Sequence, residues 1–168
     1  MAANLVRILK HLAVPDWAVR RAFPVRLGDL VTAAVRSLER AHDVELRVVV
    51  EGGMPLDALL RGQSSRDRAI ELFSRLRVWD TEQNTGVLIY VQFIDRKIEI
   101  VADRGINTKV QQVEWDAVCA QIVEEFRAGR YEDGARAGIA GVTVLLDKYI
   151  APPPEDDRDE LPDRPLVL

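Results

Sequence analysis

The stretch that most constrains the fold is the almost unbroken apolar run at residues 86–94, GVLIYVQFI. A strand of this kind carries apolar side chains on both faces, so other elements must cover both faces of its sheet. Asp95 and Arg96 follow as a two-residue turn, and the next stretch, residues 97–102, directs Ile98 and Ile100 inward. Because so short a turn joins antiparallel neighbours, the two stretches are expected to form a hairpin.

A further strand and several helices complete the pattern. Residues 45–50 alternate charged and apolar side chains, which is typical of a strand. Two helical segments, 55–61 and 64–78, separate it from the apolar run, and such a crossover makes the two strands parallel. Apolar residues three and four positions apart predict further helices at 26–42, 115–126 and 133–149. The sequence therefore predicts an α/β fold, a three-layer α/β/α sandwich on a small mixed sheet.

The two ends of the chain differ from the domain expected between them, residues 26–150. Residues 1–25 predict a basic, amphipathic helical extension that either folds back on the domain or contacts an anionic membrane or a partner. Residues 151–168 contain three consecutive prolines, at positions 152–154, and six acidic residues. This composition predicts a disordered, acidic, proline-rich tail, in which residues 166–168 offer an apolar anchor for a partner.

Composition narrows the class of protein. The 168 residues fit one domain, and the net charge of −4 argues against nucleic-acid binding, which needs a dense basic face. No apolar run reaches the roughly 18 residues of a transmembrane helix, and no signal peptide precedes residue 26, so we expect a cytoplasmic protein. Cys119 is the only cysteine, which rules out an intrachain disulfide; its apolar neighbours indicate a small buried residue.

Polar residues gather where the hairpin topology brings one sheet edge together. The loop before residue 86 contains Asp80, Glu82 and Asn84, and Asp103 follows the strand that pairs with it. Oxygen side chains at alternate positions can converge on one hard cation such as Ca²⁺ or Mg²⁺. The same residues can equally be turn residues that bond to their own backbone.

Arg104 adds a second possibility at this edge. Its guanidinium would bind an anion beside the cation, the combination that phosphoryl chemistry requires. An internal ion pair with a neighbouring carboxylate explains the same residue. The sequence contains no P-loop, GxGxxG, HExxH or CxxC motif. His42 is placed to interact with the end of a helix, which is a structural role. The sequence therefore does not decide whether the chain is an enzyme.

At residues 79–106 the chain resembles a known family. Asn84-Thr85-Gly86 before the apolar run, Asp95-Arg96 after it, Asp103-Arg104-Gly105-Ile106, and Phe126–Tyr131 before the last helix are similar to the TPM domain. The resemblance covers about residues 26–150 and is nearest to the short bacterial branch without a signal peptide or membrane anchor.

The resemblance implies a Rossmann-like α/β/α sandwich and divalent-cation binding in some members, at Asp80, Glu82, Asn84 and Asp103 here. It implies an accessory module that supports a membrane-associated or stress-related complex, with a membrane-protein partner contacted through the N-terminal segment. The alternative that it implies is a weak metal-dependent acid phosphatase, as in the plant member of the family.

Overall fold

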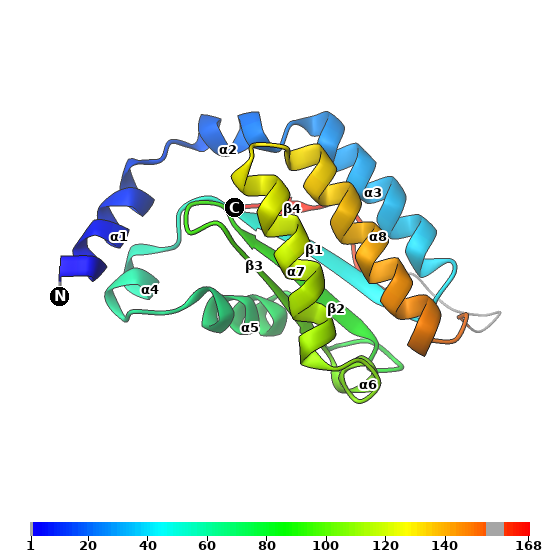
Figure 1. Cartoon of the computed structure of the whole chain (residues 1–168). Helices are drawn as coiled ribbons and strands as arrows, with labels where there is room; N and C mark the ends of the chain where they lie inside the picture. The colour runs from blue at the N-terminus through cyan, green and yellow to red at the C-terminus, as the bar shows by residue number, and fades with distance from the viewer. Residues whose placement is uncertain (1, 154–159) are drawn as a thin grey trace.

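A computed structural model describes residues 2–153 and 160–168 of the chain (Figure 1). Its elements are, in order, α1 (Ala2–Ala13), α2 (Asp16–Ala22), α3 (Val25–Glu39), β1 (Glu45–Glu51), α4 (Leu56–Leu60), α5 (Ser65–Arg75), β2 (Gly86–Gln92), β3 (Lys97–Ala102), α6 (Arg104–Asn107), α7 (Gln112–Arg127), α8 (Tyr131–Tyr149) and β4 (Leu166–Val167). Two of them, α6 and β4, are absent from the sequence prediction.

The strands form one mixed sheet in the order β3-β2-β1-β4. β1 and β2 are parallel, with Val48 opposite Ile89, and β2 and β3 are antiparallel, with Ile89 opposite Ile100. Both relations confirm the prediction from the crossover and the hairpin. β4 adds a short parallel edge strand that pairs Val49 with Leu166.

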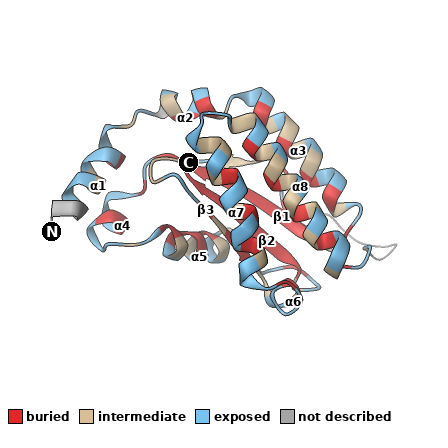
Figure 2. Cartoon of the chain, viewed as in Figure 1, coloured by how far each residue is buried: buried red, intermediate tan, exposed pale blue. Residues whose placement is uncertain are grey.

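Helices cover both faces of the sheet, and the strands are buried between them (Figure 2). α3, α7 and α8 pack on the face that presents Val48, Val50 and Ile89. α5 packs on the opposite face, against Leu88 and Tyr90. Every residue of β2 is buried, as its unbroken apolar run requires. The three-layer α/β/α sandwich is thereby confirmed.

Small residues on α8 let α7 approach its backbone closely. A Cβ atom added at Gly134 would lie 2.5 Å from the ring of Phe126, and one at Gly138 would lie 2.6 Å from Ile122. These glycines are four residues apart and share one face of α8, as Ile122 and Phe126 do on α7. A larger residue at either glycine would force the two helices apart.

The face of β1 toward α5 carries charged side chains that are nevertheless buried. Glu45, Arg47 and Glu51 are each at most 9% exposed. Arg47 donates to the carbonyl oxygens of Pro162 and Arg164, and the backbone N–H of Leu161 donates to Glu45 at 2.9 Å. The segment 161–164 therefore supplies the polar partners that two buried side chains of β1 require.

Glu51 has partners on the sheet and on α5. Tyr90 donates its hydroxyl to one carboxylate oxygen at 2.6 Å, and the Nε atom of Arg68 lies 3.1 Å from both oxygens. Burial and the charge of Glu51 raise the pKa of Tyr90 well above its ordinary value, so the hydroxyl keeps its proton. Burial alone would lower the pKa of Arg68, but the bonds to Glu51 outweigh it and raise that pKa.

The prediction of a disordered tail over 151–168 is wrong for residues 160–168. Leu161 is buried beside α5, Asp163 is 5% exposed, and Leu166 and Val167 pair with β1. The composition of the segment is that of a solvated tail, but β1 offers it buried charges to satisfy and an open strand edge to join. Residues 154–159 lie outside the described part of the chain.

The turn between β2 and β3 is longer than predicted. β2 ends at Gln92, so residues 93–96 form a four-residue loop in place of Asp95 and Arg96 alone. The Gln92 side chain accepts hydrogen bonds from the backbone N–H groups of Ile94 and Asp95, at 2.8 and 3.0 Å. Arg96 closes the loop with a left-handed φ of 53°.

Leu161→Ala should destabilise the protein by about 2–3 kcal/mol, because it removes a buried side chain from the second face of the sheet. Val167→Ala is the matched control, since Val167 is 46% exposed, and it should cost less than about 1 kcal/mol. Urea unfolding measures both values. Equal small effects for the two variants would contradict the docked position of residues 160–168.

Candidate functional site

The loop between α5 and β2 has a fixed course. Asn84 has a left-handed φ of 56°, and its N–H donates to the carbonyl of Thr81. The Thr81 hydroxyl accepts from the N–H of Thr85 at 3.0 Å. At Gly86 the chain runs so close to Val78 that a Cβ atom would lie 1.8 Å from the Val78 carbonyl oxygen. These contacts hold the loop at the edge of the sheet where residue 103 follows β3.

Three of the predicted site residues meet there. The Nε atom of Arg104 donates to the Asn84 side-chain oxygen at 2.9 Å, and the N–H of Gly105 donates to the Asn84 carbonyl. Asp103 caps α6 by accepting the backbone N–H of Arg104 at 2.7 Å. These hydrogen bonds give Asn84, Asp103 and Arg104 structural roles in the turn and at the start of α6. The guanidinium of Arg104 pairs with the side-chain amide of Asn84.

Asp103 also has an oxygen without a partner. Its Oδ2 atom is buried and has no hydrogen-bond partner within the described part of the chain. A buried carboxylate oxygen of this kind is costly unless something pairs with it.

The other two predicted ligands lie on the surface of the loop. Asp80 is exposed and its nearest ion-pair partner is Arg77, at 3.9 Å. The backbone N–H of Glu82 donates to the Glu160 carboxylate at 3.1 Å, which joins the loop to the C-terminal segment. Across residues 2–153 and 160–168, no three His, Cys, Asp or Glu side chains gather closely enough to hold a metal ion.

At the opposite sheet edge, three side chains fasten α1 to the β2–β3 loop, an arrangement that sequence reasoning missed. Arg7 donates to Asp95 Oδ2 at 2.7 Å, and His11 Nε2 lies 3.1 Å from Asp95 Oδ1. Because the N–H of Met54 donates to His11 Nδ1, the ring carries its proton on Nε2 and donates it to Asp95. Asp95 follows β2, but nothing in the sequence links it to residues more than 80 positions earlier.

Burial alone would raise the pKa of Asp95, but the hydrogen bonds from Arg7 and His11 outweigh it and hold that pKa below its ordinary value. The ionised carboxylate is therefore the form that fastens α1. Ile8 adds an apolar contact with the cluster of Met54, Ala58 and Leu59.

The remaining polar candidates have structural partners. His42 is buried, with one ring nitrogen 3.1 Å from the Leu38 carbonyl and the other 2.9 Å from Asp147. Burial raises the pKa of the Cys119 thiol to about 12, so the thiol stays protonated, but the residue is half-buried and not fully buried as predicted.

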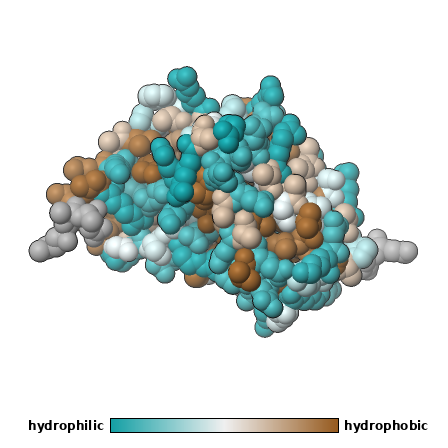
Figure 3. All heavy atoms as spheres, viewed as in Figure 1, coloured by the Kyte–Doolittle hydropathy of each residue, from teal (hydrophilic) through white to brown (hydrophobic). Residues whose placement is uncertain are grey.

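The outer side of α1 is apolar and open to solvent. Figure 3 shows apolar side chains gathered around this end of the molecule. Four large apolar side chains of α1 and one of α2 are each more than half exposed. We call them the N-terminal apolar surface: Leu5, Val6, Leu9, Leu12 and Trp17. The exposed basic residues Lys10, Arg20 and Arg21 lie on the same two helices.

The fold and sequence together match one family. The sequence profile of the TPM domain matches residues 29–144. The chain belongs to the TPM domain family. The structure is similar to the BA42 protein of the psychrophilic bacterium Bizionia argentinensis, with 31% identity and a TM-score of 0.71, over 85% of this chain and 93% of that one.

A second solved structure shares the fold. It is the N-terminal domain of a protein from P. gingivalis, with 19% identity and a TM-score of 0.59, over 71% of this chain and 73% of that one. Among curated proteins there is no match. In the described part of this TPM chain, no helix is both long and apolar enough to cross a membrane.

Acid should release α1 from this TPM domain. A carboxylate with a depressed folded pKa stabilises the fold above its ordinary pKa of about 3.9, and that contribution is lost as the pH falls through the folded value. Asp95→Asn should have the same effect at pH 7, because it removes the carboxylate that fastens α1. We expect the free energy that protects the backbone amides of α1 from exchange to fall by only about 1 kcal/mol, since solvent screens a partly exposed charge pair. Amide hydrogen exchange measures it. Asp57→Asn, which neutralises an exposed side chain of α4, should leave the protection of α1 unchanged; loss of protection there as well would contradict a specific role for Asp95.

Proposed function

We propose that this TPM domain is a non-catalytic interaction module that supports a membrane-associated complex. The observation that carries the proposal is the N-terminal apolar surface, which stays exposed although α1 is fastened to the domain on its other side. Five neighbouring large apolar side chains in water are unfavourable for an isolated domain, and such patches mark binding surfaces.

The way α1 is held suits this role. Arg7 and His11 use the hydrogen-bonding capacity of Asp95 and of the Met54 backbone, so they fix the helix on the domain. A helix that is fixed before it binds loses less conformational freedom on binding. The basic side chains Lys10, Arg20 and Arg21 favour a partner with an acidic border around an apolar centre.

A photo-crosslinking residue at position 9 tests the proposed surface in intact cells. We expect a crosslinked product in the membrane fraction when the reactive group replaces Leu9. The same group at Arg75, which is exposed on α5, should give none. Adding Leu12→Glu should reduce the product at least about tenfold, since it places a charge within the N-terminal apolar surface. The same products from positions 9 and 75 would contradict the proposal.

A second proposal is divalent-cation binding beside Asp103. The unpartnered, buried Oδ2 atom supports it, because a hard cation is one group that could satisfy a carboxylate oxygen there. Asn84 contributes less than the sequence suggests, since its side-chain oxygen already accepts from Arg104. Asp80 and Glu82 would have to act from the exposed side of the loop, which favours weak binding of a largely hydrated ion.

Calorimetric titration with Ca²⁺ and with Mg²⁺ tests the cation proposal. We expect measurable heat that Asp103→Asn abolishes, that Asp80→Ala reduces, and that Asp57→Asn leaves unchanged. No heat from the unsubstituted protein would remove the cation proposal and leave the interaction module. The alternative of an acid phosphatase stays a prediction; it requires metal-dependent hydrolysis of a phosphomonoester that Arg104→Met abolishes.

A further inference from the structure

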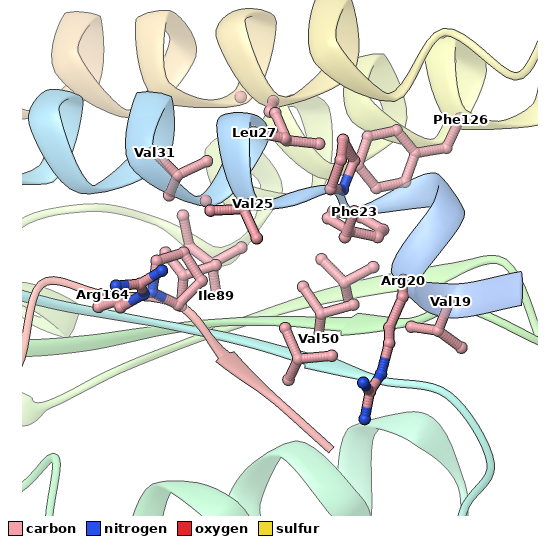
Figure 4. A pocket seen from close by; sticks show the side chains of 18 of the residues that line it. Val19, Arg20, Phe23, Val25, Leu27, Val31, Val50, Ile89, Phe126 and Arg164 are labelled. Atoms are coloured by element: carbon pink, nitrogen blue, oxygen red, sulfur yellow. The ribbon is translucent and has the colours of Figure 1, made fainter. Parts of the chain in front are cut away.

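An apolar cavity of about 430 Å³ lies between the sheet and the layer of α3, α7 and α8 (Figure 4). Val50 and Ile89 form its floor, Leu27 and Val31 line it from α3, and Phe126 lines it from α7. Its volume is within the roughly 300–1,000 Å³ of small-molecule sites, which are mostly apolar with a few polar groups that orient the ligand.

Aromatic side chains close one end of the cavity. Phe23 packs against Phe126 with ring centroids 5.6 Å apart, and Phe126 packs against Tyr131 at 5.3 Å. Edge-to-face pairs of this kind are favourable and hold their rings in place. Packed aromatic rings therefore close the end of the cavity near α2 and α7.

The C-terminal segment borders the opposite side. Val167 and Leu168 line the cavity and are about half exposed, and Val25 at the start of α3 is 70% exposed. Apolar side chains thus reach from the core to solvent along this border. An apolar molecule can contact them before it reaches the floor of the cavity.

The charged side chains that line the cavity are of one sign. They are Arg20, from α2, and Arg164, which precedes β4, and no acidic residue is in the lining. Figure 4 shows the two arginines on opposite sides of the apolar side chains around Val25 and Val50. Arg20 forms no ion pair within residues 2–153 and 160–168, and Arg164 has Asp29 only at 3.9 Å.

We propose that this cavity binds a free amphiphile with an apolar body and a single carboxylate, such as a medium-chain fatty acid. The apolar body occupies the space above Val50 and Ile89, and the carboxylate remains at the border, where a guanidinium can pair with it through two hydrogen bonds. The site is separate from the N-terminal apolar surface and from the Asp103 loop, so it goes beyond the proposed function.

Decanoate below its micelle concentration is the probe, with decanol as the neutral probe of the same length. NMR shifts of the valine and isoleucine methyl groups in the cavity report binding inside it, and titration gives the affinities. We expect decanoate to bind on the order of tenfold or more tightly than decanol, because a charge-assisted hydrogen bond distinguishes them.

Four variants separate the parts of the site. At least one of Arg20→Gln and Arg164→Gln should weaken decanoate binding several-fold and leave decanol unchanged, because one guanidinium holds the carboxylate. Arg21→Gln, on the same helix as Arg20 but outside the lining, should change neither. Gly28→Leu should abolish binding of both probes by filling the cavity, since Gly28 lines it and a Cβ there meets no atom within 4 Å. Replacing a glycine within a helix favours the helix, and a thermal melt confirms that this variant folds.

Three results with the free probes would overturn the proposal. They are no shift of the cavity methyl groups with decanoate, equal affinity for decanoate and decanol, or unchanged decanoate binding in both arginine variants. Binding to phosphatidylglycerol vesicles without binding of free decanoate would also overturn it, because the surface of a membrane would then be the ligand.

Discussion

Three charged side chains on the central strand β1 determine what packs on the face of the sheet that α5 covers. Glu45, Arg47 and Glu51 are removed from water, and an unpaired buried charge costs several kcal/mol. Glu51 finds Arg68 and Tyr90, which positions α5, and Glu45 and Arg47 find the backbone of residues 161–164. The other face is apolar throughout and depends on the close fit of α3, α7 and α8. Strand β1 thus positions α5 through buried charged side chains on one face and packs against α3, α7 and α8 through apolar side chains on the other.

The part of the fold that could be predicted is the part that local patterns determine. The apolar run of β2 indicates burial on both faces, and helical periodicity gives the layers. β4 could not be found in this way, because its two residues follow a segment with the composition of a solvated tail. What orders that segment is Glu45 and Arg47, more than 110 residues earlier. The β2–β3 loop was misjudged because Gln92 ends the strand with its own side chain.

The position of the candidate site could be predicted from the sequence, but the hydrogen bonds among its side chains could not. Topology correctly puts Asn84, Asp103 and Arg104 at one edge of the sheet. The sequence cannot show that Arg104 occupies the amide oxygen of Asn84, because this depends on the left-handed backbone at Asn84 and on the course of α6. The Asp95 contacts and the apolar cavity were missed for a related reason. Each joins segments that are distant in the chain, and neither contains a local motif.

The long separation between Arg47 and its partners also has a consequence for synthesis. The carbonyl groups of Pro162 and Arg164 follow Arg47 by 115 and 117 residues, so a ribosome makes them roughly 6 to 23 seconds later at about 5–20 residues per second. During that interval Arg47 lacks these two carbonyl partners, so its charge stays hydrated. Because α8 ends at Tyr149, only 13 residues before Pro162, the apolar layer and the segment that covers Arg47 are completed almost together.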